Sequence, residues 1–297
     1  MASKLNIIIV NWEREEDTLE CLHSIKKQLI NYQDYNVFLV DNGSKEGIDK
    51  IKAIFFPFNL FIIENSENKG FTGGNNTGLE MAMNYNSLYT LLLNNDTVLV
   101  DNSIQEAISF LDQNKNFGIV GLINYYFHNN KIWQAGFKLN LNTGKQKQVL
   151  PSLTSMNQYS EVDYVPGSSL IIRTNLIDKI GLLDDNYFAY WEEVDWCMKV
   201  RQLGYKIGFL NSSKVLHKVK QTTSSKVHFY LSNRNKLYFN KKNAPKKTFQ
   251  IIFVKVIFRF LIKKIFMKES NSFRTFGLLV KDFLTGNMGK GSLDNLR

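Results

Sequence analysis

The segment that decides the fold is Leu5-Asn6-Ile7-Ile8-Ile9-Val10-Asn11, followed further along by Asn36-Val37-Phe38-Leu39-Val40-Asp41-Asn42-Gly43-Ser44. The first is a nearly continuous run rich in β-branched residues, which is typical of a strand buried on both faces of a sheet, and Asn36–Val40 in the other is expected to be a second strand. Between them, apolar residues recur at helical spacing across Glu15–Leu29. Two buried strands separated by a helix predict an α/β fold.

The same alternation continues through the next 170 residues or so and predicts one α/β domain. A glycine-rich turn at residues 68–74 is expected to open a helix around Asn76–Asn84. Residues 124–164 are rich in Asn, Gln, Ser and Thr, and predict loops and short antiparallel strands. Further strands are expected at Leu60–Ile63, Leu88–Leu93, Gly118–Ile123, Gly167–Arg173 and Lys206–Leu210, and further helices near Ile104–Leu111 and Trp191–Leu203.

Charge divides the 297 residues into two parts. Residues 1–240 hold 24 basic and 24 acidic residues, whereas residues 241–297 hold 13 basic and 3 acidic residues, so the net charge of +10 belongs to the C-terminal part. We therefore expect a neutral domain over 1–240 and a basic helical tail over 241–297. A concentrated positive charge points to a membrane surface or a nucleic acid as the tail's partner.

The tail contains an amphipathic helical pattern. Over residues 246–268 it is rich in Phe and Ile, and Lys255, Arg259 and Lys263 recur every four residues, which places them on one helical face. Such a helix is able to lie in the headgroup region of a bilayer, and we expect a membrane surface as its partner. Packing of its apolar side on the body or on a second subunit, as in a homodimer, is the alternative.

Targeting features are weak. The apolar run Leu5–Val10 is too short for the core of a signal peptide. The longest uncharged apolar stretch, Ala53–Ile63, contains Pro57 and falls short of the ~20 residues of a membrane span. Two cysteines, Cys21 and Cys197, cannot form a disulfide framework, which favours a reducing compartment. We expect neither secretion nor a transmembrane anchor.

Candidate functional residues follow two of the predicted strands. Asp41 follows the second strand and Asp96 the fourth. Ligands of open parallel sheets bind at the carboxyl ends of strands, so the two acids are expected to meet at one crevice. An Asp after a strand is also ordinary turn chemistry, and this reading stays open for each acid taken singly.

The segment from Gly70 to Gly78, Gly-Phe-Thr-Gly-Gly-Asn-Asn-Thr-Gly, is expected to let backbone amides approach a ligand closely and to open a helix N-terminus. It is neither a Walker loop nor a Gly-x-Gly-x-x-Gly motif, and alone it is weak support for phosphate or nucleotide binding.

The densest polar cluster is Tyr190-Trp191-Glu192-Glu193-Val194-Asp195-Trp196. On a helix Glu192 and Asp195 share a face. Acids at a helix N-terminus often only complement its dipole, whereas acids among aromatic rings are able to act as bases with a raised pKa. His217, by its position alone, is more often structural, and no Cys or His spacing indicates a metal site.

The order of these motifs resembles the family 2 glycosyltransferases of GT-A fold, and among them the bacterial rhamnosyltransferase-like branch. The resemblance covers residues 4–240 and leaves the basic tail out. It implies a Rossmann-like, mixed and mostly parallel sheet flanked by helices. The matching segments, in chain order, are Ile8–Trp12, Val40–Ser44, Asn68–Phe71 with Gly73–Gly78, Leu92–Asp96, Gly167–Leu170, Ile180–Asp184, Phe188–Asp195 and His217.

The resemblance implies roles for individual residues. Asp41 would bind the nucleobase of a nucleotide-sugar donor, and Asp96, the end of an Asn-Asn-Asp element, would bind Mg²⁺ or Mn²⁺ together with His217. Glu193 falls on the family's catalytic base, although the pair here is Glu192-Glu193 rather than Glu-Asp; Asp195 is the reserve candidate. A shift of about 1 Å in such a group can cost roughly 100-fold in rate. The other donor-binding residues it implies are Asn11, Asn68, Lys69, Gly70, Gly74, Asn94 and Asn95.

The function expected from the resemblance is metal-dependent, inverting transfer of a hexosyl or rhamnosyl group from a UDP- or dTDP-sugar. The acceptor would be a hydroxyl of a growing polysaccharide or lipid-linked saccharide, at the cytoplasmic face of the membrane. The alternative is a non-catalytic protein that binds nucleotide sugars or serves as a scaffold with a degenerate site, which the Glu192-Glu193 pair motivates. No nucleic-acid-binding fingerprint occurs, and nucleic acid is not an expected partner.

Overall fold

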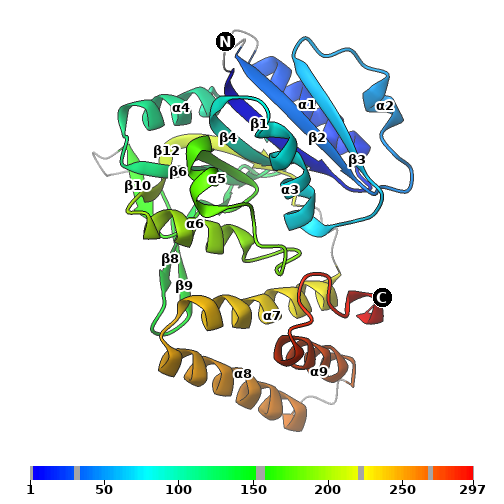
Figure 1. The fold of residues 1–297 in the computed structure, drawn as a ribbon, viewed down its shortest axis with the longest axis vertical. Coiled ribbons are helices and arrows are strands. Elements are labelled where there is room, and N and C mark those ends of the chain that lie inside the picture. The colour runs from blue at the N-terminus through cyan, green and yellow to red at the C-terminus, as the bar shows by residue number, and fades with distance from the viewer. Residues whose placement is uncertain (1–2, 30–33, 152–157, 220–223, 267–269, 297) are drawn as a thin grey trace.

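The computed structural model describes residues 3–29, 34–151, 158–219, 224–266 and 270–296, with only the backbone of 259–266 and 270–273. Ten strands of this part form one mixed sheet, whose main path runs β10–β12–β6–β11–β4–β1–β2–β3 (Figure 1). Their bounds are β1 Ser3–Asn11, β2 Tyr35–Asn42, β3 Asn59–Asn65, β4 Ser87–Asn94, β5 Thr97–Leu99, β6 Phe117–Tyr126, β7 Ile132–Gln134, β10 Tyr159–Val162, β11 Ser169–Arg173 and β12 Lys206–His217.

The sheet is parallel where the sequence predicted buried strands. β1 pairs in parallel with β2 and with β4, and β2 pairs in parallel with β3. β11 runs antiparallel between β4 and β6, which makes the sheet mixed. The predicted fold class is confirmed. The parallel register places Asn11 beside Asp41, and Val10 beside Asn94, so the polar ends of three strands meet at one edge.

Helices cover both faces of the sheet. Ile7 and Ile9 of β1 pack in the cluster on the side of α1 and α4, whereas Ile8 packs on the side of α3, α5 and α6. This explains the continuous apolar run of β1, which is buried on both faces. The helices of the domain are α1 Glu15–Gln28, α2 Asp49–Lys52, α3 Gly70–Ala82, α4 Ser103–Gln113, α5 Thr174–Ile180 and α6 Glu192–Gln202.

The glycine-rich segment is helical, which differs from the turn predicted at 68–74. α3 begins at Gly70, and its glycines allow the helix to lie close to the sheet. A Cβ on Gly74 would come within 2.7 Å of Val10 Cγ1, and a Cβ on Gly78 within 2.5 Å of Ile8 Cγ2. Part of the glycine pattern therefore serves helix–sheet packing rather than ligand binding.

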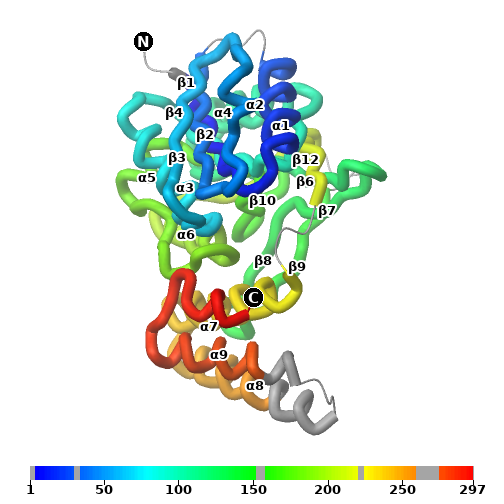
Figure 2. Tube along the Cα trace, turned by 90° about the vertical axis from the view of Figure 1, so that its right-hand side faces the viewer, coloured from blue at the N-terminus to red at the C-terminus, as the bar shows by residue number. Residues whose placement is uncertain are grey.

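The tail helices α7 (Ser225–Asn243), α8 (Lys246–Phe266) and α9 (Ser270–Thr285) lie together at one end of the molecule, as Figure 2 shows. The predicted boundary at residue 240 falls inside α7, and residues of all three helices and of the short 3-10 helix Leu293–Leu296 share one apolar cluster. That cluster also contacts Phe188 and Tyr190 of the domain. The tail is thus packed onto the domain rather than appended to it.

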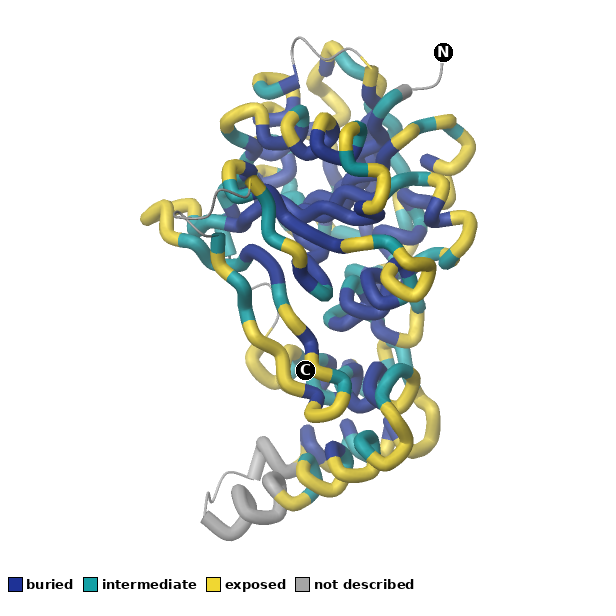
Figure 3. The backbone as a smooth tube through the Cα atoms, turned by 90° about the vertical axis from the view of Figure 1, so that its left-hand side faces the viewer, coloured by how far each residue is buried: buried dark blue, intermediate teal, exposed yellow. Residues whose placement is uncertain are grey.

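The described residues of the polar segment 124–164 form short antiparallel strands, as predicted. β8 (Gly136–Asn140) and β9 (Lys145–Val149) make a separate hairpin. A Cβ on Gly144 at its tip would lie 2.9 Å from Ile252 of α8, so the hairpin reaches the tail. Figure 3 shows exposed residues along the outer side of α8. No helix in the described part of the chain is long and apolar enough to cross a membrane.

Candidate active site

A cleft of about 820 Å³ opens at the edge where β1, β2 and β4 end. Its walls come from distant parts of the chain, from strand ends, the start of α3, the turn before α6, α7 and the C-terminal segment. We call the side lined by strand ends and α3 the donor wall, made of Asn42, Asn68, Gly70, Asn94, Asn95 and Asp96. We call the part lined by α7 and the C-terminal segment the C-terminal wall, made of Val227, His228, Leu231, Lys290 and Leu293.

Asn11 and Asp41 lie beside the donor wall and do not line the cleft. The Asn11 amide donates to Asp41 Oδ1 at 2.9 Å, and the Ser44 hydroxyl donates to the same oxygen at 2.5 Å. Asn95 reaches this network, since its amide donates to Thr18 Oγ1 at 2.9 Å. Asp41 and Asp96 therefore do belong to one edge of the sheet, with Asp41 held in a buried hydrogen-bond network.

Asn42 organises the loop before α3. Its Nδ2 donates to Asn68 Oδ1 at 3.2 Å and to Gly70 O at 3.0 Å, and its Oδ1 accepts from the Lys69 backbone amide at 3.2 Å. Asn42 lines the cleft, and the sequence analysis did not select it. Of the predicted donor residues here, Asn68 and Gly70 line the cleft, whereas the Lys69 side chain is exposed beside it and Gly74 is buried against β1.

Asp96 and His217 face each other in the cleft. His217 Nε2 lies 3.4 Å from Asp96 Oδ1 and 3.3 Å from Asn94 Nδ2, and both side chains are buried. Burial raises the pKa of Asp96, partly opposed by His217, and burial lowers the pKa of His217. Asp96 Oδ1 is buried without a hydrogen-bond partner. A buried carboxylate oxygen of this kind lacks the compensation that a hydrogen bond or a cation would supply.

These two side chains fit a hard cation as a partial ligand set. Within the described residues no group of three or more His, Cys, Asp and Glu side chains is arranged to hold a metal ion, so a donor's own oxygens would have to complete the coordination. His217 Nδ1 accepts the backbone N–H of Val219 at 3.0 Å. A neutral ring then carries its proton on Nε2, and coordination through Nε2 requires that Val219 release Nδ1.

Glu192 and Glu193 both line the cleft at the start of α6. Burial raises the pKa of Glu193 to about 6, although backbone amides of Trp191, Glu193 and Val194 counteract part of the effect. Burial, and then the charge of Glu193, raise the pKa of Glu192 well above its usual value. One Oε2 of each is buried without a hydrogen-bond partner. Adjacent buried carboxyls do not readily ionise together, so Glu193 is the one suited to be a carboxylate near neutral pH.

The turn that leads into these acids has an unusual backbone. The φ angles of Phe188, Tyr190 and Trp191 are +63°, +71° and +82°, in a region that bulky residues rarely adopt. Such residues persist only where the surrounding structure holds them, at a cost of order 1–3 kcal/mol each. Gly70 allows the close approach of this turn, since a Cβ there would lie 2.3 Å from Phe188 O.

Asn235 of α7 holds the turn. It is fully buried, and its amide donates to the carbonyl oxygens of Tyr187, Ala189 and Tyr190 at 2.7, 2.8 and 3.0 Å. Arg234 in turn donates to Asn235 Oδ1. The sequence analysis missed Asn235 because a single Asn in a helix about 45 residues further along carries no local signal.

Asp195 lies away from the cleft, which differs from the expectation that it shares the site with Glu193. It is 1% exposed and accepts from Lys242 Nζ at 2.8 Å and from Asn243 Nδ2 at 3.3 Å, both at the end of α7. The side chain of Asp195 therefore faces α7. This ion pair joins α6 to α7.

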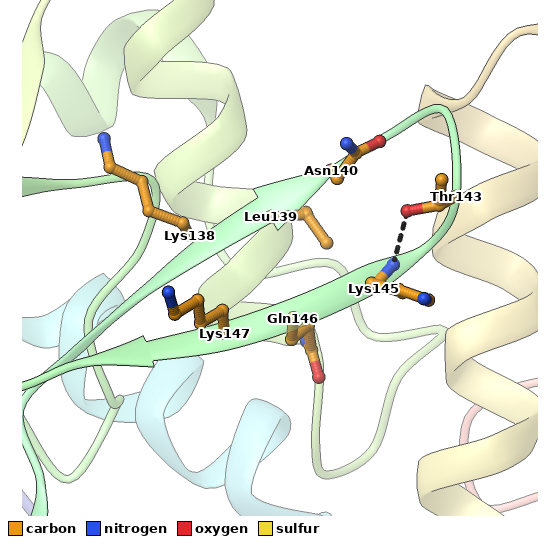
Figure 4. Close-up of a pocket in the computed structure, with 7 residues that line it drawn as sticks. All are labelled: Lys138, Leu139, Asn140, Thr143, Lys145, Gln146 and Lys147. Carbon is orange, nitrogen blue, oxygen red and sulfur yellow. Dashed lines mark hydrogen bonds between the residues drawn. The ribbon is translucent and has the colours of Figure 1, made fainter.

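A second hollow, of about 490 Å³, lies on the β8–β9 hairpin (Figure 4). It is lined by Lys138, Lys145 and Lys147 together with uncharged residues, and by no carboxylate among the described residues. Of these two hollows, the larger cleft is the one that combines acids, amides and a histidine.

The family is shown by sequence. A model of glycosyl transferase family 2 matches residues 6–180, which is more than half of the chain. The chain therefore belongs to glycosyl transferase family 2. It is 26% identical over 249 residues to the low-salt glycan biosynthesis hexosyltransferase Agl10 of Haloferax volcanii, covering 80% of this chain and 75% of that protein. It is 21% identical over 210 residues to the glycosyltransferase AglE of the same organism, covering 69% of this chain and 64% of that one.

Solved structures share the fold. TarS of S. aureus superposes with a TM-score of 0.63 at 16% identity, over 95% of this chain and 49% of TarS. GalNAc-T7, solved with UDP, GalNAc and Mn²⁺, gives 0.61 at 16% identity, over 77% of this chain and 47% of that one. The mannosyltransferase PcManGT of Pyrobaculum calidifontis, solved with GDP-Man and Mn²⁺, superposes with a TM-score of 0.60 at 14% identity, over 84% of this chain and 69% of that one. The chain spans about half the length of the first two, and its fold is GT-A.

Proposed function

We propose that this protein is an inverting glycosyltransferase that moves a sugar from a nucleoside-diphosphate donor to a hydroxyl of a growing glycan. One observation carries the proposal: a single cleft is lined by Asp96 and His217 and also by Glu193, whose Oε2 is buried without a hydrogen-bond partner. Membership of the family and the likeness to glycan-synthesising relatives support it.

The donor is assigned to the wall at the strand ends. We propose that Asn68, Gly70, Asn94 and Asn95 contact the nucleotide and its sugar. Asn11 and Asp41 position Asn95 and the nucleobase, Lys69 acts from the rim, and Gly74 sets the close packing of α3. Amide side chains suit such a ligand because they donate and accept hydrogen bonds to ribose, base and sugar. The nucleotide is proposed to be UDP or dTDP; a structural neighbour was solved with UDP.

Asp96 and His217 are proposed to hold Mg²⁺ or Mn²⁺ together with the donor. The unpartnered Oδ1 of Asp96, 3.4 Å from His217 Nε2, is the observation that fits a cation. When bound, a hard cation would neutralise the negative charge that gathers on the leaving diphosphate.

Glu193 is proposed to be the catalytic base. As a carboxylate it accepts the proton of the acceptor hydroxyl while that oxygen attacks the anomeric carbon and the nucleoside diphosphate leaves. General-base catalysis of this kind contributes ~100- to 10,000-fold. A pKa of about 6 leaves the group ionised at neutral pH while keeping it basic enough to accept a proton. The mechanism inverts the anomeric centre because the acceptor oxygen attacks, in a single displacement, on the face opposite to the leaving nucleoside diphosphate.

The acceptor is proposed to be a polysaccharide or a lipid-linked saccharide, and the transferred group a hexose or rhamnose. The test is incubation of the full chain with UDP-, dTDP- and GDP-sugars, a saccharide acceptor and Mn²⁺, with release of nucleoside diphosphate as the readout. Asp96→Ala is expected to abolish release, and Asp34→Ala, which removes an exposed acid, to preserve it. Donor binding without turnover would favour the non-catalytic alternative.

We also propose that α8 binds the inner face of the cell membrane. Ile251, Val254 and Phe258 are 54%, 63% and 60% exposed on successive turns, beside exposed Lys255. The proposed basic stripe continues at Arg259 and Lys263, whose side chains lie outside the described residues, as do residues 267 and 268 at the end of the predicted segment. Val254→Glu should reduce co-sedimentation with anionic vesicles, and Leu88→Glu, at a remote exposed site, should not. A dimer that dissociates in Val254→Glu would instead indicate packing between subunits.

A further inference from the structure

The C-terminal wall is built from residues that follow the family match. That match ends at residue 180, whereas the wall comes from α7 and from the segment after α9, which lies against α7 (Figure 1). Lys290 and Leu293 thus belong to the last few residues of the sequence and still line the cleft that contains Glu193. Their placement in this cleft depends on how the C-terminal segment is held.

A buried cluster holds the C-terminal segment on α7. Asp282 accepts from the Tyr230 hydroxyl, and from the backbone amide and the hydroxyl of Ser292 at 2.9 and 3.0 Å. Arg234, fully buried, donates to Tyr230 Oη at 3.0 Å and to Gly289 O at 2.6 Å. Buried charged groups that are hydrogen-bonded in this way fix one arrangement of the chain. The C-terminal segment is therefore held in place on α7 by specific hydrogen bonds.

Packing at Gly291 is close. A Cβ on Gly291 would lie 2.3 Å from Arg234 Nη1 and 2.3 Å from Tyr230 Oη, and its φ is +52°. By contrast, Gly286 has a φ of +73°, and a Cβ there would meet no atom of the described residues within 4 Å. The two glycines share the backbone requirement and differ in contact, so they form a matched pair for substitution.

The wall combines cationic or hydrogen-bond-donating groups with aliphatic ones. The ring of His228 lies edge-on to that of Tyr190, with 4.8 Å between the ring centroids, and Tyr190 is close in sequence to Glu193. Lys290 lines the same cleft. Val227, Leu231 and Leu293 lie beside them. The acids of the cleft, Glu67, Asp96, Glu192 and Glu193, all come from other elements.

The ion pair that Lys290 makes within the protein is weak. The Lys290 ammonium lies 2.9 Å from Asp294, but both side chains are largely exposed, at 44% and 62%. An exposed ion pair of this kind contributes about 0–1 kcal/mol, so an anion in the cleft is able to displace it. A hydrogen bond between a charged donor and a phosphate oxygen is stronger.

We propose that the C-terminal wall binds a phosphate group of the acceptor, attached to an aliphatic chain. Lys290 and His228 donate to the phosphate, and Val227, Leu231 and Leu293 contact the first carbons of the chain. This inference rests on the proposed function and narrows its acceptor to a phosphate-linked lipid saccharide. Sugar hydroxyls alone would not need a cation beside aliphatic side chains, whereas an alkyl phosphate presents both groups together.

The test compares two acceptors with one saccharide, joined to a decyl chain either through a phosphate or as a simple glycoside. Lys290→Gln is expected to raise the acceptor KM about 10-fold or more for the phosphate-linked compound, as the loss of a charged hydrogen bond implies. The donor KM and the KM for the glycoside should be unchanged. Lys281→Gln, an equal charge change at an exposed position outside the cleft, is the control.

Gly291→Ala supplies an independent readout. It is expected to raise the KM of the phosphate-linked acceptor while Gly286→Ala, with comparable backbone strain, has little effect; nucleotide binding, titrated directly, should stay at the wild-type level in both. Equal KM values in Lys290→Gln and wild type overturn the inference while turnover continues. A change in donor KM alone also overturns it, because Lys290 would then bind the donor. Absence of turnover and of nucleotide binding in the wild type would contradict the proposed function itself.

Discussion

The two walls of the cleft are built by different means. The donor wall comes from short contiguous segments at the ends of β2 and β4 and at the start of α3, and parallel pairing with β1 fixes their relative positions. The C-terminal wall comes from α7 and a segment about 60 residues further along, joined by one buried cluster around Asp282. The first is set by sheet register and the second by a few long-range side-chain contacts.

The two walls should therefore respond differently to changes in the sequence. A register shift between β1 and a neighbouring strand would displace the donor-wall residues at the end of that strand and would exchange side chains between the two buried faces of the sheet. The C-terminal wall, in contrast, depends on individual groups such as Asp282 and Arg234, each of which makes several hydrogen bonds. Substitutions on that side should therefore alter acceptor use or kcat while donor binding is retained.

The largest expected effect is at Glu193, which lines the same cleft as the two walls. Glu193→Gln keeps the shape of the side chain and removes the base, so kcat should fall ~100- to 10,000-fold. The dissociation constant of the donor, measured by calorimetry, should be unchanged. Glu80→Gln, at an exposed position of α3, is the control. Turnover at the wild-type level in Glu193→Gln would show that another group accepts the proton.

The pH dependence of turnover is expected to follow the Glu192–Glu193 pair. Since the base acts as a carboxylate and its pKa is raised to about 6, kcat/KM should fall about tenfold per unit below that pH. The stability of the fold should depend on pH in the opposite direction. The pKa of Glu193 is about 6 in the folded state and exceeds its usual value of 4.5, so its contribution to stability is fully present below pH 4.5 and is lost as the pH rises through 6. A profile that is flat between pH 5 and 7 would contradict the assignment of Glu193.

Asn235→Ala probes how the C-terminal side positions the acids. Losing the amide leaves carbonyl oxygens of the strained turn unpaired, which should lower the free energy of unfolding by ~1–3 kcal/mol. We expect kcat to fall about 10-fold as the turn relaxes, since misplacement of a reacting group is costly. Asn233→Ala, on the same helix but only partly buried, should change neither quantity. A rise in the donor KM of Asn235→Ala without a fall in kcat would contradict this prediction, because it would show that a change on α7 alters the donor wall.

Asp195→Ala should give the smallest effect on catalysis. The substitution removes a partner of Lys242, which is partly exposed, so we expect a loss of about 1–2 kcal/mol in the free energy of unfolding. Turnover per folded molecule should stay at the wild-type level, because Asp195 lies outside the cleft. Chemical denaturation and kcat measured together test this. A large loss of kcat would restore Asp195 as the reserve base.

The sequence predicted the sheet well because buried strands leave continuous apolar runs. The strand expected at Leu5–Asn11 is observed at Ser3–Asn11, and the helix expected at Trp191–Leu203 at Glu192–Gln202. Residues 68–74 were expected to be a turn, yet Gly70 to Gly74 are inside α3, because glycine also permits close helix–sheet packing, as at Gly74. Local patterns do not distinguish these two uses of glycine.

The candidate site was predictable only where residues are adjacent in the chain. Asp96 and Glu193 were selected from short motifs, and the structure brings both to one cleft. Asn42, Asn235 and Lys290 were not, because their roles come from contacts with residues that are distant in sequence. Asp195 was selected for its neighbours in sequence, whereas its environment is set by Lys242 of α7.

The most direct test of the central claim is the anomalous scattering of Mn²⁺ in crystals grown with Mn²⁺ and UDP, or with dTDP in its place. We predict one Mn²⁺ peak within coordination distance of the Asp96 carboxylate, with the diphosphate in the cleft along the donor wall and facing Glu193. Nucleotide bound elsewhere on the molecule, or Mn²⁺ bound away from Asp96, would contradict the account.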